Sequence, residues 1–243
     1  MTGNLDTTGR CLFELRFEQI APGRAVSELV EWYRKAMSDG GEPSLWSRHS
    51  IPTPLEMSCV VIGPHSIITL YRWNSLTERE SSFGRLLESG DAPAIVPGAE
   101  GSLLREAESW ILAGAPAGEA LVEAGAPNAT DKLQELRIQQ VLNGSSTEAA
   151  ETLTRHELSM AIERGARIRG VYELAIGPER PLLISFLSWN AKTPPERAWA
   201  EIDAAQADQR DAERQKHQRR LVGISRRYLM RPLRNGGFEG AVG

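Results

Sequence analysis

Apolar and charged residues alternate near the start of the chain, and this period of two predicts a strand. Phe13, Leu15 and Phe17 alternate with glutamate and arginine side chains, as in a strand that places one face on a core. From Val26 to Met37 the apolar positions follow helical spacing instead, until two glycines end the pattern. The beginning of the chain therefore predicts a strand followed by a helix.

The rest of the first half predicts further strands and a second helix. Ser75 and Glu78 have the spacing of a capping box, in which each side chain satisfies a backbone N–H at the start of a helix. We therefore expect a helix to begin at Ser75. The β-prone runs that predict strands are 46–49, 58–62, 67–73 and 110–112.

The second half repeats the order of the first, with a helix predicted over 147–162. The offsets between matching motifs differ by only a few residues, as expected for two copies of one unit with loop insertions. The matching motifs are Glu-Leu-Arg at 14–16 and 135–137, Gly-Pro at 63–64 and 177–178, and Trp-Asn at 73–74 and 189–190.

Each copy has the order strand, helix, strand, strand, helix, strand, which is the ferredoxin-like order. Such a sheet buries one face under its helices and leaves the other face in need of a cover. We therefore expect an α+β protein in which two tandem ferredoxin-like repeats form a pseudodimeric α+β barrel. The expected segments are a first repeat at 11–112, a linker at 113–131, a second repeat at 132–233 and a flexible tail at 234–243.

The alternation also predicts which side chains face the barrel interior. If Phe13, Leu15 and Phe17 face the helices, the charged residues of the same strand face inward. The expected inward-facing residues are Glu14, Arg16, Glu18, Thr69, Tyr71 and Trp73, and by the repeat Glu135, Arg137, Ser185, Leu187 and Trp189. Such a set suits a partly apolar ligand with one or two polar groups. The favoured alternative is that each Glu and Arg form a salt bridge that closes the centre.

His49 is the candidate general acid or base, because an imidazole titrates near neutral pH. It lies beside Trp46, which is assigned to the same ligand site, although a lone histidine on a strand is more often structural. His156 has no second ligand one turn later, which argues against a metal site. The motifs of nucleotide, zinc and serine-hydrolase sites are missing from the sequence. No cofactor and no metal are expected.

Composition adds limits on partners. The chain of 243 residues has 28 Lys and Arg against 32 Asp and Glu, so neither nucleic acid nor a membrane surface is an expected partner. The basic run at 214–234 is interpreted as a solvated helix end and an edge strand protected by arginines. The polar N-terminus, the lack of a long apolar run and two isolated cysteines predict a cytoplasmic protein. Further association into a homo-oligomer is also expected.

The strand, turn and capping residues of the first copy resemble the NIPSNAP domain, a branch of the dimeric α+β barrel superfamily. The resemblance is carried by Phe13 to Arg16, Gly63-Pro64 and the run Tyr71 to Arg79, and is weaker in the second copy. It implies a barrel with a central cavity and bacterial relatives in small-molecule metabolism.

The expected function is binding of a small organic molecule. If the protein is an enzyme, it is a cofactor-independent isomerase, cyclase or oxygenase of bacterial secondary metabolism, in which His49, Glu14 or Glu135 moves a proton. The alternative is a non-catalytic scaffold with a packed barrel.

Overall fold

The computed structural model of the chain forms two compact units. Unit 1 comprises residues 1–113 and 232–243, and unit 2 comprises 114–231. The residues that the structure describes are 12–38, 43–61, 65–115, 133–141, 147–177, 182–189, 194–205 and 222–233, without the side chains of 147–153 and 222–225. Residues 116–131 of the expected linker, residues 214–221 of the basic run and the tail lie outside the described residues.

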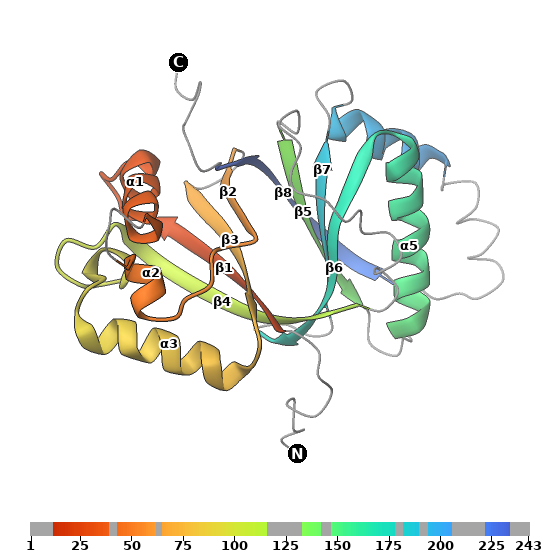
Figure 1. Cartoon of the computed structure of the whole chain (residues 1–243). Helices are drawn as coiled ribbons and strands as arrows, with labels where there is room; N and C mark the ends of the chain where they lie inside the picture. Colours follow the sequence, from red (N-terminus) through yellow and green to blue (C-terminus); the bar gives the residue numbers. More distant parts are fainter. Residues whose placement is uncertain are drawn as a thin grey trace. The chain divides into compact units, whose positions relative to one another are not determined.

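Unit 1 is an antiparallel sheet in the order β4-β1-β3-β2 with helices on one face (Figure 1). This is the strand order of a ferredoxin-like unit. Its elements are β1 (Leu12–Ile20), α1 (Val26–Met37), α2 (Leu45–Arg48), β2 (Glu56–Val60), β3 (Ser66–Trp73), α3 (Leu76–Ser89), a 3₁₀ turn (Pro93–Ile95) and β4 (Leu104–Gly114).

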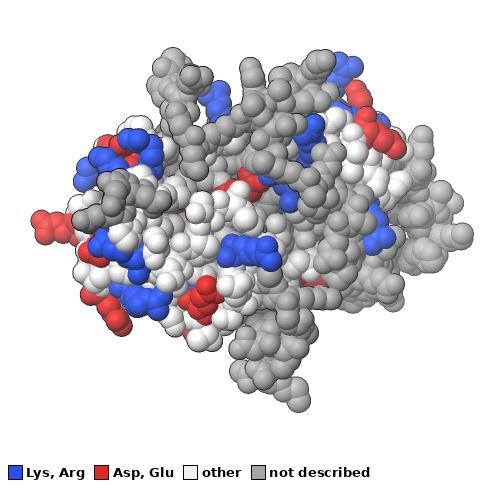
Figure 2. Space-filling view, in the orientation of Figure 1, with Lys and Arg blue, Asp and Glu red and all other residues white. Residues whose placement is uncertain are grey.

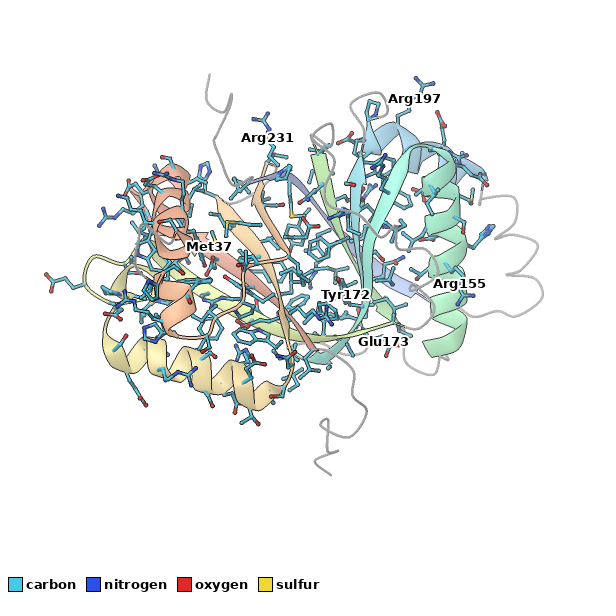
Figure 3. The ribbon with its side chains drawn as sticks, in the orientation of Figure 1. Met37, Arg155, Tyr172, Glu173, Arg197 and Arg231 are labelled. Atoms are coloured by element: carbon cyan, nitrogen blue, oxygen red, sulfur yellow. The ribbon has the colours of Figure 1, made fainter. Side chains whose placement is uncertain are left out.

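Unit 2 has the equivalent order β8-β5-β7-β6, and α5 covers one face (Figure 1). The exposed side chains of Arg155 and Arg197 point away from this sheet, and Tyr172 lies on the face opposite to α5 (Figure 3). The elements are β5 (Leu133–Val141), α5 (Thr147–Glu163), β6 (Ala166–Ile176), β7 (Leu182–Trp189), a helix over 195–205 and β8 (Val222–Pro232).

The expected order of elements is therefore confirmed in both repeats, and the predicted caps explain where helices begin. The Ser75 hydroxyl accepts from the backbone N of Glu78 at 3.1 Å, and the Glu78 carboxylate accepts from the N–H of Asn74 at 3.1 Å. Gly90 ends α3 in the left-handed conformation, with φ of 69°, which glycine adopts without a steric penalty.

The strand expected at 46–49 is wrong, because this segment forms the short helix α2 and ends at His49. The Ser44 hydroxyl accepts from the backbone N of Ser47 at 3.1 Å. This N-cap satisfies a donor that a helix leaves unpaired, and so favours helix over strand. Ser50 follows with φ of 57°, which turns the chain away from the helix direction.

The expected orientation of β1 is also wrong. Tyr33 of α1 donates its hydroxyl proton to Glu18, so the charged face of β1 is the one that meets the helices. In the antiparallel register Glu14 lies opposite Tyr71 and Arg16 lies opposite Thr69, which places these side chains on the same face. Phe13, Leu15 and Phe17 occupy the other face of the sheet.

None of the described helices is both long and apolar enough to span a membrane. On the face of unit 1 that Figure 2 shows, acidic and basic side chains are interspersed. Some exposed charges are paired locally, as where Arg34 contacts Glu31 at 2.6 Å on α1. The surface seen there carries no large field of one sign.

Candidate functional site

A set of polar side chains lies between the sheet and the helices of unit 1, and we call it the polar layer of unit 1. Strand β1 places alternate residues on this face, β3 supplies the side chains opposite them, and α1, α2 and α3 provide the cover. The members are Glu14, Arg16, Glu18, Tyr33, Trp46, Thr69, Tyr71, Trp73 and Arg79.

Glu18 is held by a tyrosine and an arginine in the interior of the layer. The Tyr33 hydroxyl is 2.6 and 2.7 Å from the two carboxylate oxygens of Glu18, to which it donates. Arg16 Nη2 lies 3.1 Å from Oε1 of the same carboxylate, and Glu18 is fully buried. Both oxygens of Glu18 therefore already accept hydrogen bonds.

Glu14 forms the second buried ion pair. Its Oε1 accepts from Arg79 Nη2 at 2.7 Å, and its Oε2 accepts from Trp73 Nε1 at 3.0 Å. The guanidinium groups of Arg16 and Arg79 both lie over the Phe83 ring, at 4.8 and 5.5 Å from its centroid. Each carboxylate of the layer thus has its own guanidinium partner, and the aromatic ring adds cation–π stabilisation.

Burial changes the protonation behaviour of the layer. Burial raises the pKa of the Glu18 carboxyl, although Arg16 and the hydrogen bond from Tyr33 act against this. Burial and the neighbouring Glu18 charge also raise the pKa of Tyr71 and that of Tyr33. Both phenols consequently stay protonated and can act as hydrogen-bond donors, whereas Glu18 takes up a proton more readily than an exposed glutamate.

Several buried polar atoms in this layer have no hydrogen-bond partner. An unsatisfied buried group costs about 1–3 kcal/mol, so a cluster of them calls for an occupant that pairs with them. The atoms are Arg16 Nε, Trp46 Nε1, Thr69 Oγ1, Tyr71 Oη and Arg79 Nε.

Aromatic rings surround these atoms. The Trp46 ring packs edge-on against Tyr33 at 5.6 Å and against Trp32 at 5.4 Å between centroids. On the other side, the ring centroids of Tyr71 and Trp73 are 6.3 Å apart. The unpartnered donors therefore lie in an aromatic environment, which suits a planar apolar group that carries a few polar atoms.

Unit 2 has a polar layer at the equivalent place, built on Glu135 and Arg137. Glu135 Oε2 accepts from Trp189 and Trp199 at 2.8 Å each. Arg137 donates to Glu157 of α5 at 3.1 Å and lies 3.8 Å from the centroid of the Trp199 ring. Burial raises the pKa of the Glu135 carboxyl. As in unit 1, the predicted residues face the helices, because charged side chains find their partners there.

The polar layers of the two units differ at the positions of two titratable side chains of unit 1, Glu18 and Tyr71. The repeat places Gln139 at the position of Glu18 and Leu187 at the position of Tyr71, since each occupies the same place in its strand register. Gln139 is bonded to Glu157 at 3.1 Å. The fold therefore does not require an acid and a phenol at these positions, which marks unit 1 as the more specialised unit.

His49, the predicted general acid or base, is placed outside both layers. Its Nε2 lies 3.1 Å from Oδ2 of the exposed residue Asp91. This hydrogen bond holds the pKa of the Asp91 carboxyl below its usual value. Arg85 donates to the backbone oxygen of His49 at 3.0 Å. These contacts fasten α2 to the C-terminal end of α3, and they favour a structural role.

The structure thus groups the predicted site residues in two sets by unit. The unit 1 set is Glu14, Arg16, Trp46, Thr69, Tyr71 and Trp73, and the unit 2 set is Glu135, Arg137, Ser185 and Trp189. Sequence reasoning did not select Glu18, Tyr33 or Glu157 for the site. Glu18 continues the alternation of Glu14 and Arg16, so this pattern was a usable signal. Tyr33 and Glu157 were hidden in helical segments.

No family model and no curated protein sequence matches the chain. Several solved structures are similar to it. A Fusobacterium nucleatum protein provisionally named a monooxygenase has 7% identity and a TM-score of 0.58, covering 93% of this chain and 94% of that one. A chlorite dismutase variant from Candidatus Nitrospira defluvii has 13% identity and a TM-score of 0.52, covering 91% and 92%. A heme-binding protein from Thermus thermophilus has 9% identity and a TM-score of 0.50, covering 93% and 92%.

These likenesses confirm the expected α+β fold with two tandem ferredoxin-like repeats. At such low identity they concern the fold alone, because one fold hosts many functions. The activity must be argued from the side chains of this chain.

Proposed function

We propose that the protein binds a small organic molecule in the polar layer of unit 1 and transfers a proton there without a cofactor. The observation that carries the proposal is the cluster of buried, unpartnered polar atoms on Arg16, Trp46, Thr69 and Tyr71. A ligand that pairs with these atoms removes their desolvation cost on binding. The resemblance to NIPSNAP proteins, a role in secondary metabolism and assembly into homo-oligomers belong to the same proposal.

The proposed roles follow from which atoms are engaged and which are not. Arg16 is oriented by Glu18 through Nη2 and keeps its Nε–H for the ligand. Thr69 and Tyr71 direct unpartnered hydroxyl groups from β3, and Trp46 offers its indole N–H. Glu18 is the group that holds or releases a proton, because it is a carboxyl group bonded to Arg16 within the layer and burial raises its pKa.

No histidine among the described residues is placed to hold a haem iron. Haem iron is held by an axial side chain such as histidine inside a pocket, but His65 and His156 are exposed and His49 is bonded to Asp91. The fourth histidine lies outside the described residues. The helix–sheet layer of unit 2 is filled by one buried cluster that includes Trp189 and Trp199. The proposed proton transfer accordingly uses the chain's own side chains.

A non-catalytic scaffold is the second candidate, and unit 2 favours it. Its layer is closely packed, and Leu187 replaces the tyrosine that unit 1 has at this position. If unit 1 behaves in the same way, its unpartnered atoms are bonded to ordered water alone. The two candidates differ in whether a small molecule competes for Thr69 and Tyr71.

A fragment screen by ligand-observed NMR distinguishes the ligand-binding protein from the scaffold. Wild type is compared with Thr69→Val, which removes one unpartnered hydroxyl at constant shape. The control is Ser188→Ala, which removes an unpartnered buried hydroxyl in unit 2. The proposal predicts compounds whose binding is lost in Thr69→Val and kept in Ser188→Ala. A screen in which no compound distinguishes these variants would favour the scaffold.

Proton transfer is tested on the compounds found. In D2O, wild-type protein should catalyse exchange of an acidic C–H of the bound compound with solvent deuterium. Glu18→Asp keeps the charge but retracts the carboxylate by one carbon, so it should slow the exchange by tenfold or more without abolishing binding. Equal exchange rates in both proteins would remove Glu18 from the reaction.

A further inference from the structure

The unpartnered atoms of the polar layer of unit 1 can nearly all be described as hydrogen-bond donors. Arg16 Nε and Trp46 Nε1 are donors only, whereas the hydroxyl groups of Thr69 and Tyr71 can donate or accept. Among the described residues of this layer, no carboxylate oxygen is unpartnered, because those of Glu14 and Glu18 already accept. The layer therefore has no spare carboxylate acceptor, and its unpartnered atoms are donors or hydroxyl groups that can donate.

The charges of the layer are already balanced. Glu18 is paired with Arg16 at 3.1 Å, and Glu14 is paired with Arg79 at 2.7 Å. An added anion would find no unpaired cation among these residues, and burying an uncompensated charge is costly. An added ammonium group would find no spare carboxylate to balance its charge. Both ionic classes of ligand are disfavoured for this reason.

A neutral oxygen acceptor satisfies both conditions. A carbonyl oxygen has two lone pairs and brings no charge, so it can accept from Tyr71, Thr69 or the guanidinium Nε of Arg16. The surrounding rings of Tyr33, Trp46 and Trp73 favour a planar or aromatic group next to that oxygen. An alcohol of the same shape is a weaker match, because its oxygen is a poorer acceptor for several donors and its own proton must be accepted by the hydroxyl of Thr69 or Tyr71.

We infer that the ligand of unit 1 is a neutral aromatic or conjugated carbonyl compound, whose oxygen is bound by the unpartnered donors. This inference rests on the proposed function. It also fits the proposed proton transfer. When Glu18 takes a proton from the carbon next to the carbonyl, the C–H electron pair forms an enolate. The developing oxygen charge is then stabilised by the same donors, and return of the proton to the enolate completes the cycle.

The layer of unit 2 provides an internal contrast. There, Arg137 Nε and Nη1 are unpartnered donors and the Ser185 hydroxyl is unpartnered too, but Oε1 of Glu135 is an unpartnered carboxylate acceptor, and the position of Tyr71 is occupied by Leu187. Spare donors without a spare carboxylate acceptor are therefore a property of the unit 1 layer. We expect carbonyl selectivity to respond to changes in unit 1 alone.

The test uses four probes that share one ring and differ in the polar group: acetophenone, 1-phenylethanol, benzoate and benzylammonium. Dissociation constants are measured with the full chain by NMR titration at neutral pH. Acetophenone should bind at least tenfold more tightly than each of the others. Tyr71→Phe and Thr69→Val should each weaken acetophenone by about tenfold, the effect expected for one lost hydrogen bond of roughly 1.4 kcal/mol. Ser188→Ala should leave its affinity unchanged.

The outcomes separate the ligand class from the site. If benzoate, benzylammonium or 1-phenylethanol binds as tightly as acetophenone and depends on Thr69 and Tyr71, the carbonyl inference is wrong while the proposed site stands. If no probe responds to either variant, both the inference and the proposed site are wrong. Thr69→Val keeps the side-chain shape, so its effect is interpretable even if Tyr71→Phe alters the packing.

Discussion

Two tyrosines lie in the polar layer of unit 1, and removing the hydroxyl group of each should change the free energy of unfolding in opposite directions. Both are buried, but the hydroxyl of Tyr33 donates to the Glu18 carboxylate at 2.6 and 2.7 Å, whereas that of Tyr71 has no partner at good hydrogen-bond geometry and only a weaker interaction with Tyr33. Tyr→Phe removes one oxygen and leaves the ring in place. The pair therefore compares a satisfied with an unsatisfied hydroxyl within one layer.

The structure sets the sign and the size of each effect. Tyr33→Phe removes a hydrogen bond to a charged group, worth about 1.5–3 kcal/mol, and leaves the Glu18 carboxylate with one partner fewer. Tyr71→Phe removes a buried group that is already unsatisfied, so it should raise the free energy of unfolding of the ligand-free protein by about 1 kcal/mol. The two variants should thus differ by roughly 3 kcal/mol.

Urea unfolding at pH 7, followed by tryptophan fluorescence and by circular dichroism, measures both variants. Agreement of the two signals checks that a single transition is being compared. An unchanged denaturant slope assigns the shift in midpoint to stability. If Tyr71→Phe destabilises the protein as much as Tyr33→Phe does, the Tyr71 hydroxyl is bonded within the protein, and the reasoning that makes it a ligand contact is refuted.

Three further predictions concern the buried charges. Arg16→Met should lower the free energy of unfolding by about 3–5 kcal/mol, because the Glu18 carboxylate stays buried without its cation; a loss below about 1 kcal/mol in urea unfolding would contradict this. Burial raises the pKa of Glu135, so its stabilising contribution is present below its unfolded pKa of about 4.3 and is lost as pH rises through the folded pKa. Glu135→Gln should therefore weaken the decline of stability above that unfolded pKa, and identical pH profiles would exclude the effect. Trp199→Phe keeps a ring over the arginine but removes the donor to Glu135, so it should cost about 2 kcal/mol in the same assay; an unchanged midpoint would show that this hydrogen bond contributes nothing.

The architecture could be predicted because its signals are local and occur twice. The capping pair Ser75 and Glu78, the helical spacing of 26–37 and the repeated Glu-Leu-Arg and Trp-Asn motifs each reflect short-range geometry. Segment 46–49 failed because a four-residue helix is too short to show a period, and its Ser44 cap decided the structure.

The orientation of the first strand could not be predicted from alternation alone. Alternation separates the side chains of a strand into two faces. The apolar face is assigned to the helices only on the assumption that the other face is more exposed to solvent. Here Leu15 and Glu14 are both fully buried although they point to opposite faces. Charged residues can face a helical layer when that layer supplies partners, as Tyr33 and Arg79 do. Those partners lie far away in sequence, so they became visible only in the folded chain.

The candidate site was also predicted only in part. The residue types were largely predicted, since Arg16, Trp46, Thr69 and Tyr71 were all selected as ligand contacts. Their location was not, because it depends on the orientation of the strand. The role of Glu18 emerged only from its hydrogen bond to Tyr33, a tertiary contact that no local pattern encodes.

The most direct test of the central claim is a high-resolution crystal structure of the protein soaked with the tightest of the four probes. The probe should lie between the sheet and the helices of unit 1, with its oxygen within hydrogen-bond distance of the Thr69 and Tyr71 hydroxyl groups. A structure in which both hydroxyl groups are bonded to protein or ordered water alone, with the probe bound elsewhere, would contradict it.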